Sequence, residues 1–250
     1  MCTIVLLRAP GQAWPLLLAA NRDEMLSREA LAPARHWPDR PDVVAGRDLA
    51  AGGTWLGLND QGLIAAISNR RGALGPAPGL RSRGELPLMA LAHGSATRAA
   101  EALATLDAGL YRPFNLILAD CHEAYLLCNR QGAGAIDCSV IPDGLSMLTA
   151  AELDDQTSPR IRHYLPRFRR AAPPLPADGD WTDWQALLAS SHGPDADDPN
   201  SAMTVNAVDG FSTVSSSLIA LPAAPAARPL WLYADGRPDE TPYRAVDLGD

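Results

Sequence analysis

Short apolar runs bounded by turn residues constrain the fold of this chain more than any other feature of its sequence. Two such runs occupy residues 2–7 and 14–20, and Pro10 and Gly11 lie between them. Both runs are apolar on both faces, without alternating polar residues, which is typical of strands buried between layers. We therefore predict a pair of buried strands at the start of the chain.

The remainder of the chain alternates predicted strands with helical regions. Strands are expected at residues 43–45, 53–58, 63–68, 114–120, 124–128, 135–140, 215–221 and 230–234. Helices are expected at residues 84–106, 158–170 and 181–191, the first of them split at Gly94 with Ser95 as N-cap. A hairpin turn is predicted at residues 59–62, and a proline-rich surface loop at residues 25–42.

This order of elements predicts an α+β layered domain in which helices cover sheets. A hydrophobic content of 47% is ample for a sizeable core and excludes a disordered chain. The sequence contains no internal repeat, and its 250 residues are within the size range of one domain. We therefore expect a single domain over residues 1–250.

Charge and hydropathy exclude several classes of function. The formal net charge of −8 is expected to repel phosphate backbones, so no nucleic-acid partner is predicted. All 21 basic residues are arginine, which excludes lysine Schiff-base and P-loop chemistry. The N-terminal run lacks a basic region and is interrupted at Arg8, unlike a signal peptide. No apolar stretch approaches the ~20 residues that span a membrane, so the sequence predicts a cytoplasmic protein without integral membrane association.

The spacing of the four cysteines does not indicate a metal site. None forms a CxxC pair and no paired histidines lie at zinc spacing, so no metal is expected. Cys121, Cys128 and Cys138 lie in apolar, strand-like segments and are expected to be inert core thiols.

Cys2 is the residue most expected to carry chemistry. Its small side chain permits removal of Met1, which leaves Cys2 with a free α-amine beside its thiol. An α-amine titrates near ~7.7–8.0, so close to neutral pH it can act as a base toward its own side chain. Nucleophile and base then belong to one residue, as in N-terminal nucleophile catalysis. The alternative is an accidental cysteine at the second position.

A polar cluster, Asn21-Arg22-Asp23-Glu24, ends the second predicted strand. By period-2 alternation Asn21 and Asp23 share one face, and Arg22 and Glu24 share the other. If this strand neighbours the first, Asp23 can hold the α-amine of Cys2, and Asn21 supplies an amide group nearby. The alternative is a solvated strand end with a local Arg–Glu pair.

Two further segments carry candidate residues. The glycines around Trp55 permit close backbone approach or a bulge, and Trp55 itself belongs either to the core or to a ligand site. Asn69 follows the next strand, and its amide is a plausible oxyanion donor. The adjacent Arg70 either contacts a ligand or, with Arg71, forms a solvated turn.

Several motifs occur in a definite order along the chain. They are MCTIVLL, LLLAANRDE, GGTWLGLN, ISNRRG, RGEL and FNLILAD in the first half, and SAMTVNAVDGFSTVSSSLIAL and ADG…TPY in the last third. In this order they resemble the NRDE family, also known as the transport and Golgi organisation protein two family. The resemblance is dense in the first half and looser in the last third.

This resemblance implies an α+β fold, a four-layer αββα sandwich of mainly antiparallel sheets. The fold is similar to that of N-terminal nucleophile hydrolases such as penicillin V acylase and bile-salt hydrolase. It implies that Cys2 is the nucleophile, that Asn21 and Asp23 belong to its site, and that Asn69 is an oxyanion asparagine.

The chain departs from the hydrolase pattern at three points. Ala20 stands before Asn21 where those enzymes carry arginine, and Arg22 follows instead. Residues 146–149 offer only hydroxyls where a second oxyanion asparagine is expected. Val214 stands in the segment where a late active-site arginine is expected.

Three hypotheses about function follow from the resemblance. Family members are connected with moving haem and with lipid metabolism, which favours binding and handling of a hydrophobic small molecule such as haem. Its pocket would lie at Cys2, with Arg22, Trp55 and Arg70 as ligand contacts and a thiolate or histidine as axial ligand. The alternative is a Cys2-dependent amidohydrolase or acylase acting on a small-molecule amide or ester, and the third is a scaffold with a lost active site. No cofactor is required by any of them.

Overall fold

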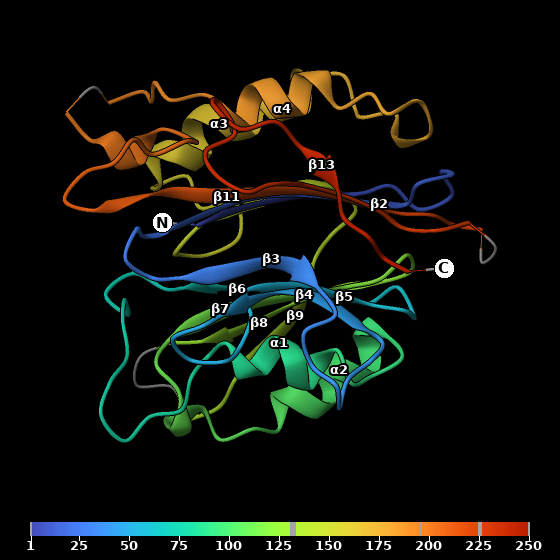
Figure 1. Ribbon diagram of the computed structural model, residues 1–250, viewed down its shortest axis with the longest axis vertical. Helices are drawn as coiled ribbons and strands as arrows, with labels where there is room; N and C mark the ends of the chain where they lie inside the picture. Colours follow the sequence, from blue (N-terminus) through green and yellow to red (C-terminus); the bar gives the residue numbers. More distant parts are fainter. Residues whose placement is uncertain (1, 131–133, 196, 225–226, 250) are drawn as a thin grey trace. The chain divides into compact units, whose positions relative to one another are not determined.

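The computed structural model describes residues 2–130, 134–195, 197–224 and 227–249. The chain divides into two compact units: the first comprises Met1–Ser27 with Asp143–Val246, and the second comprises Arg28–Pro142 with Asp247–Asp250. Each unit contains one antiparallel sheet and a pair of α-helices (Figure 1). That residues 1–250 act as a single domain stays a prediction.

The first unit is a six-stranded sheet in the order β10-β1-β2-β11-β12-β13. Its strands are β1 (Thr3–Arg8), β2 (Leu16–Met25), β10 (Gly144–Leu148), β11 (Phe211–Leu221), β12 (Leu230–Ala234) and β13 (Arg244–Ala245). Helices α3 (Pro159–Arg170) and α4 (Thr182–Leu188) lie over one face of this sheet (Figure 1). Its described residues also include the 3-10 turns η2 (Pro176–Asp178) and η3 (Pro199–Ser201). One core joins sheet residues such as Ala19 and Leu218 to the helix residues Phe168 and Trp184.

The second unit is a seven-stranded sheet in the order β3-β4-β5-β6-β7-β8-β9. Its strands are β3 (Ala30–Ala34), β4 (Val43–Asp48), β5 (Leu56–Asn59), β6 (Ile64–Asn69), β7 (Phe114–Ala119), β8 (Ala124–Asn129) and β9 (Asp137–Val140). Helices α1 (Glu85–Ala90) and α2 (Ala96–Ala104) and the 3-10 turn η1 (Ala108–Leu110) complete it. Leu86 and Leu103 of the helices share a core with Leu63 and Phe114 of the sheet.

Several local predictions are confirmed. Strands β1 and β2 pair along their length and are buried. The hydroxyl of Ser95 accepts a hydrogen bond from the Arg98 N–H, so it caps α2 as its position predicted. In the hairpin turn, the Asn59 side-chain oxygen accepts from the Leu63 N–H, and Gly62 adopts a φ of 80°. These features depend on residues close together in sequence, which is why they could be predicted.

The structure corrects two predictions. The expected loop at residues 25–42 contains strand β3, which tolerates Pro33 because it lies at the edge of the sheet and pairs only with β4. Of the three thiols expected in the core, only Cys128 is buried. Cys138 is exposed because β9 is the other edge strand, and Cys121 is half-buried in the turn after β7. None of the helices in the described part of the chain has the length and apolar character needed to cross a bilayer.

Gly53 allows a close backbone approach in the second unit. The Thr54 N–H donates to the Gly84 carbonyl oxygen at 2.8 Å, and a Cβ on Gly53 would overlap the carbonyl carbon of Gly84. We expect Gly53→Ala to lower the free energy of unfolding by about 1–3 kcal/mol, because backbone must move to accommodate the methyl group. Urea denaturation measures this loss. Gly94→Ala is the matched control, since no described atom lies within 4 Å of its added Cβ; equal effects of the two changes would contradict the prediction.

Candidate active site

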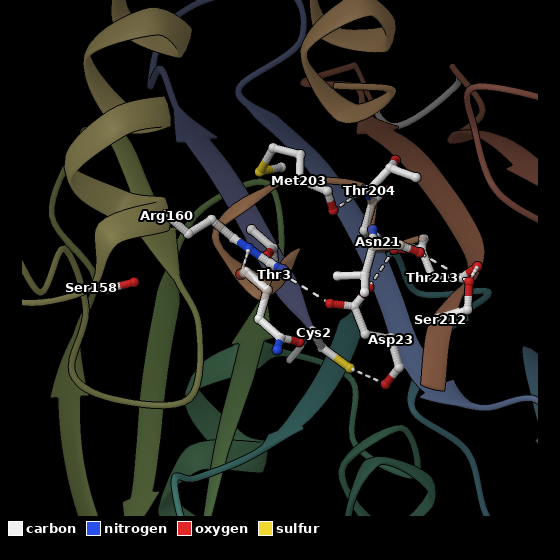
Figure 2. Close-up of polar contacts among 12 residues, drawn as sticks. Cys2, Thr3, Asn21, Asp23, Ser158, Arg160, Met203, Thr204, Ser212 and Thr213 are labelled. Atoms are coloured by element: carbon white, nitrogen blue, oxygen red, sulfur yellow. Dashed lines mark hydrogen bonds and ion pairs between the residues drawn. The ribbon is translucent and has the colours of Figure 1, made fainter. Parts of the chain in front are cut away.

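Cys2 lies immediately before β1, and its thiol is directed at the end of β2. The sulfur donates a weak hydrogen bond to the backbone carbonyl of Asp23, with a sulfur–oxygen distance of 3.6 Å (Figure 2). The pairing of Thr3 with Asn21 brings the two strand ends together. Cys2 as a residue is half-buried. The structure therefore places the predicted nucleophile beside the conspicuous polar cluster of the sequence.

The Asp23 carboxylate is fully buried and is held by partners far away in sequence. One carboxylate oxygen lies 3.1 Å from an Nη atom of Arg160, and the other accepts a hydrogen bond from the Thr213 hydroxyl at 2.6 Å. The same Arg160 nitrogen also donates to the Thr3 hydroxyl at 2.7 Å, and the Arg160 Nε donates to the Asn200 carbonyl. Figure 2 shows the guanidinium between Thr3 and Asp23. Such a network fixes the position of the carboxylate.

Asn21 connects the sheet to the segments packed over it. Its side-chain NH₂ donates to the carbonyl oxygens of Leu188 and Met203, each at 3.0 Å. Its side-chain oxygen accepts from the Ser216 hydroxyl at 2.7 Å. Both N–H donors of the amide are thus engaged within the first unit, so Asn21 orients the surrounding backbone.

The predicted alternation along β2 is confirmed. Asn21 contacts the end of α4 and Asp23 contacts α3, so both side chains lie on the helix-covered face. Arg22 and Glu24 lie on the opposite face and form an ion pair at 3.9 Å. The local Arg–Glu pair expected in the alternative of a solvated strand end is present, but Arg22 is buried, and exposure begins only at Glu24 and Met25.

The environment of Cys2 raises the pKa of its thiol above the usual value. Burial makes the largest contribution, and the negative charge of Asp23 adds to it. The positive charge of the N-terminus, the hydrogen bond to the Asp23 carbonyl and, least, the charge of Arg22 oppose them. For a nucleophilic thiol beside an amine or Arg22, a lowered pKa is expected instead. The difference arises because desolvation and the Asp23 carboxylate outweigh the N-terminal charge, the hydrogen bond to the Asp23 carbonyl and Arg22 together. The thiol is therefore neutral at rest and needs a base to become a thiolate.

Replacing Asp23 with asparagine should lower the pKa of the Cys2 thiol, because one of the causes that raise it is removed. Thiolate then forms at lower pH, and the pH profile for iodoacetamide alkylation of Cys2 should shift toward acid. Peptide mass spectrometry resolves Cys2 from the other thiols, and circular dichroism identifies the pH range in which both proteins are folded. Glu24→Gln is the control, since Glu24 is not among the groups that shift this pKa. An unchanged profile for Asp23→Asn would show that Asp23 does not control the thiol.

Arg160 is a residue of the candidate site that was not among the predicted ones. Val214 stands where a late arginine was expected, and the arginine beside Asp23 comes instead from the first turn of α3. A signal exists in the sequence, because Arg160 belongs to the stripe that includes Ile161, Tyr164 and Phe168, all buried. A charged residue at a core position of an amphipathic helix indicates a buried partner.

The remaining predicted residues belong to the second unit. Asn69 lies opposite Phe114 across β6 and β7. The Arg70 guanidinium donates to the Asn115 side-chain oxygen at 2.7 Å, so it is not simply a solvated turn residue. Trp55 packs its ring against Gly46, where a Cβ would overlap it. That Asn69, Arg70 and Trp55 act together with Cys2 stays a prediction. In the described residues, no group of three potential His, Cys, Asp or Glu ligands could hold a metal ion.

The comparison with protein families identifies the chain. The model of the Transport and Golgi organisation 2 family matches residues 1–215. The chain belongs to this family. Its relatives include the Transport and Golgi organization protein 2 homologs of Bos taurus, 34% identical over 153 residues, and of Homo sapiens, 34% identical over 151 residues. Each match covers 57% of this chain and 52% of the relative, so the chain spans about half the length of the curated relatives it matches.

Solved structures of hydrolases share the fold. The N-acylethanolamine-hydrolyzing acid amidase ortholog of Caenorhabditis elegans has a TM-score of 0.58 at 14% identity, over 90% of this chain and 94% of that chain. A mutant conjugated bile acid hydrolase from Clostridium perfringens has a TM-score of 0.53 at 11% identity, over 99% and 97%. The predicted α+β, N-terminal nucleophile hydrolase-like fold of mainly antiparallel sheets is thereby confirmed.

Proposed function

We propose that this chain is an N-terminal nucleophile amidase that uses Cys2 to hydrolyse a small-molecule amide or ester. The observation that carries the proposal is the array at the end of β2. The Cys2 thiol donates to the backbone carbonyl of Asp23 at 3.6 Å, and the carboxylate of the same residue is held by Arg160 and Thr213. The carboxylate is close enough for its charge to act on Cys2, and a fixed negative charge there suits the task of holding an α-ammonium group.

The proposed reaction begins once Met1 has been removed. The α-amine of Cys2 accepts the thiol proton while the sulfur attacks the substrate carbonyl carbon and forms a C–S bond. Collapse of the tetrahedral intermediate breaks the bond to the leaving nitrogen, which receives the proton from the α-ammonium group. Water then attacks the thioester, releases the acid and restores the thiol. A thiol that is neutral at rest is compatible with this sequence, because the proton leaves during attack.

The position of Arg160 favours hydrolysis over the binding of a hydrophobic molecule. The absence of a late arginine near Val214 was one of the arguments against hydrolysis, and Arg160 now supplies a buried cation at the candidate site. The named activities of the structural neighbours, an amidase and a bile acid hydrolase, agree with amide chemistry but establish only a shared fold. Hydrolysis therefore becomes the leading proposal, and binding of a hydrophobic molecule becomes the second.

The experiment tests the roles of the Cys2 thiol and the α-amine independently. Mass spectrometry first establishes that the purified protein has lost Met1. The protein is then incubated with N-acyl p-nitroanilides, and p-nitroaniline release and an acyl adduct on Cys2 are both measured. Cys2→Ala should abolish both signals. Inserting one alanine between Met1 and Cys2 keeps the thiol but moves the α-amine, and should reduce turnover by about 10²–10⁴-fold, as for loss of a general base. Cys138→Ala, which removes an exposed thiol, is the matched control. Turnover that survives Cys2→Ala, or no adduct with any acyl donor, would refute the proposal.

The second candidate function is binding of a hydrophobic small molecule such as haem. A cavity of about 340 Å³ lies between α3 and α4 and is lined by His163, Tyr164, Arg167, Asp183 and Leu187 among others. This volume is within the range of small-molecule sites, about 300–1,000 Å³. Burial lowers the pKa of the His163 imidazole, and the charge of Arg167 adds to this, so the ring is neutral and suited to bind iron.

Haem titration compares the two candidate axial ligands. If haem binds in this cavity, His163→Ala should abolish the Soret band shift and Cys2→Ala should leave it intact. The reverse pattern would place haem at Cys2 instead. A band shift that survives both changes would refute binding through either residue.

A further inference from the structure

The cavity between α3 and α4 is a short slot whose two ends are closed by hydrogen bonds. At one end, the Tyr164 hydroxyl lies 2.9 Å from the Ser190 hydroxyl. At the other end, the Asp183 carboxylate accepts a hydrogen bond from the Ala172 N–H at 2.9 Å. The two helices therefore run antiparallel along the slot. Ala171 follows Tyr164 by seven positions and also lines the cavity, which at the helical rise gives the slot a length of about 10 Å.

The positive charge of the slot lies toward its Tyr164 end. Arg167 lines the cavity from α3, and its guanidinium reaches back one turn to donate to the His163 carbonyl oxygen. His163 also lines the cavity, but burial and the charge of Arg167 lower the pKa of its imidazole. The ring is therefore neutral at pH 7, and the cation at this end is Arg167.

A negative charge and apolar side chains line the rest of the slot. Asp183 marks the opposite end, where its carboxylate is tied to the backbone at the end of α3. The side chains of Ala171, Ala186 and Leu187 line the space. Within residues 134–195, all of which the structure describes, no ion pair joins Asp183 to Arg167. The slot thus presents a cation near one end, an anion at the other and apolar walls.

We propose that this slot binds an ω-amino carboxylate, a molecule with a carboxylate and an ammonium group at opposite ends of an apolar chain. Arg167 binds the carboxylate, because its guanidinium has further N–H donors besides the one that contacts His163. Asp183 binds the ammonium group, and the methylene chain lies on the alanine and leucine side chains. A compact α-amino acid fits less well, since its two charges are too close together to reach both ends.

This inference does not depend on the proposed amidase. Haem, the second candidate ligand, would occupy the same cavity through the His163 nitrogen. The two ligands therefore depend on different side chains, and the experiment can distinguish them.

Calorimetry at low ionic strength with three probes of equal chain length tests each end of the slot. 6-Aminohexanoate should bind more tightly than hexanoate or hexylammonium, by about 1.5- to 5-fold for each missing charge, as for exposed ion pairs. Arg167→Gln should weaken binding of 6-aminohexanoate and hexanoate but not of hexylammonium. Asp183→Asn, which keeps an acceptor for the Ala172 N–H, should weaken binding of 6-aminohexanoate and hexylammonium but not of hexanoate. Arg162→Gln is the matched control, since Arg162 is exposed on α3 and does not line the cavity.

The selective effects keep the test valid if one variant folds poorly, because misfolding would weaken the binding of all three probes. Ala186→Leu retains a good helix former and should weaken all three, since the larger side chain occupies the slot. The inference is overturned if the three probes bind equally, if 6-aminohexanoate does not bind, or if Ala186→Leu leaves its affinity unchanged. The expected selectivity supports the inference whether or not acyl p-nitroanilides are hydrolysed. A Soret band shift that requires His163, without any binding of 6-aminohexanoate, overturns the inference and supports haem.

Discussion

Asp23→Ala is expected to lower the free energy of unfolding by about 3–5 kcal/mol, because it leaves the Arg160 charge buried without its carboxylate. Both side chains of this pair are essentially inaccessible, at 1% and 0% exposure. At such burial neither salt nor water screens the interaction. Urea denaturation followed by tryptophan fluorescence measures the loss.

The reciprocal change distinguishes the ion pair from other effects of the alanine. Arg160→Met keeps an unbranched side chain of comparable length and should destabilise the protein by a similar amount. The double variant should lose clearly less than the sum of the two, because neither charge is then left alone. Strict additivity would show that Asp23 and Arg160 do not act as a pair. Arg162→Met, on the exposed side of α3, should cost little.

The second large effect concerns the aromatic core beneath α3 and α4. Trp184 is 1% exposed, and its ring lies edge-on to Phe168 and Trp181 at centroid distances of 5.5 and 6.4 Å. Trp184→Ala should cost about 3–5 kcal/mol through lost burial and the cavity that remains. The loss should appear as a lower urea midpoint with an unchanged slope.

Trp184→Phe tests whether loss of aromatic packing causes the destabilisation, because phenylalanine keeps an aromatic ring at this position. The buried indole N–H of Trp184 has no hydrogen-bond acceptor in the part of the chain that the structure describes. Phenylalanine retains most of the aromatic packing and removes this donor, whose burial without a partner costs about 1–3 kcal/mol. The Phe variant should therefore be much more stable than the Ala variant. If both were equally destabilised, the packing explanation would be wrong.

The N-terminal hairpin shows which structural features could be predicted from local sequence. Apolar runs without alternation predicted the buried strands β1 and β2, and period-2 alternation correctly placed Asn21 and Asp23 on one face. Cys2 was recognised from its position alone. Strand β3 was missed because an edge strand tolerates proline and exposed residues, which makes it resemble a loop.

The residues that contact Asp23 in the candidate site could not be predicted from local sequence. Arg160 and Thr213 lie 137 and 190 positions from Asp23, and only the packing of α3 on the sheet and the pairing of β11 with β2 bring them to its carboxylate. The direction of the pKa shift of Cys2 likewise depends on how many distant groups exclude water from the thiol.

The sequence by itself determined which residues could react and which face of a strand each occupies, because alternation, capping and turn formation depend on neighbours within a few positions. Only the tertiary structure decided which charges meet and how strongly they act. The energy of a buried charge depends on separation and solvent exclusion in three dimensions, and neither quantity is a function of distance along the chain.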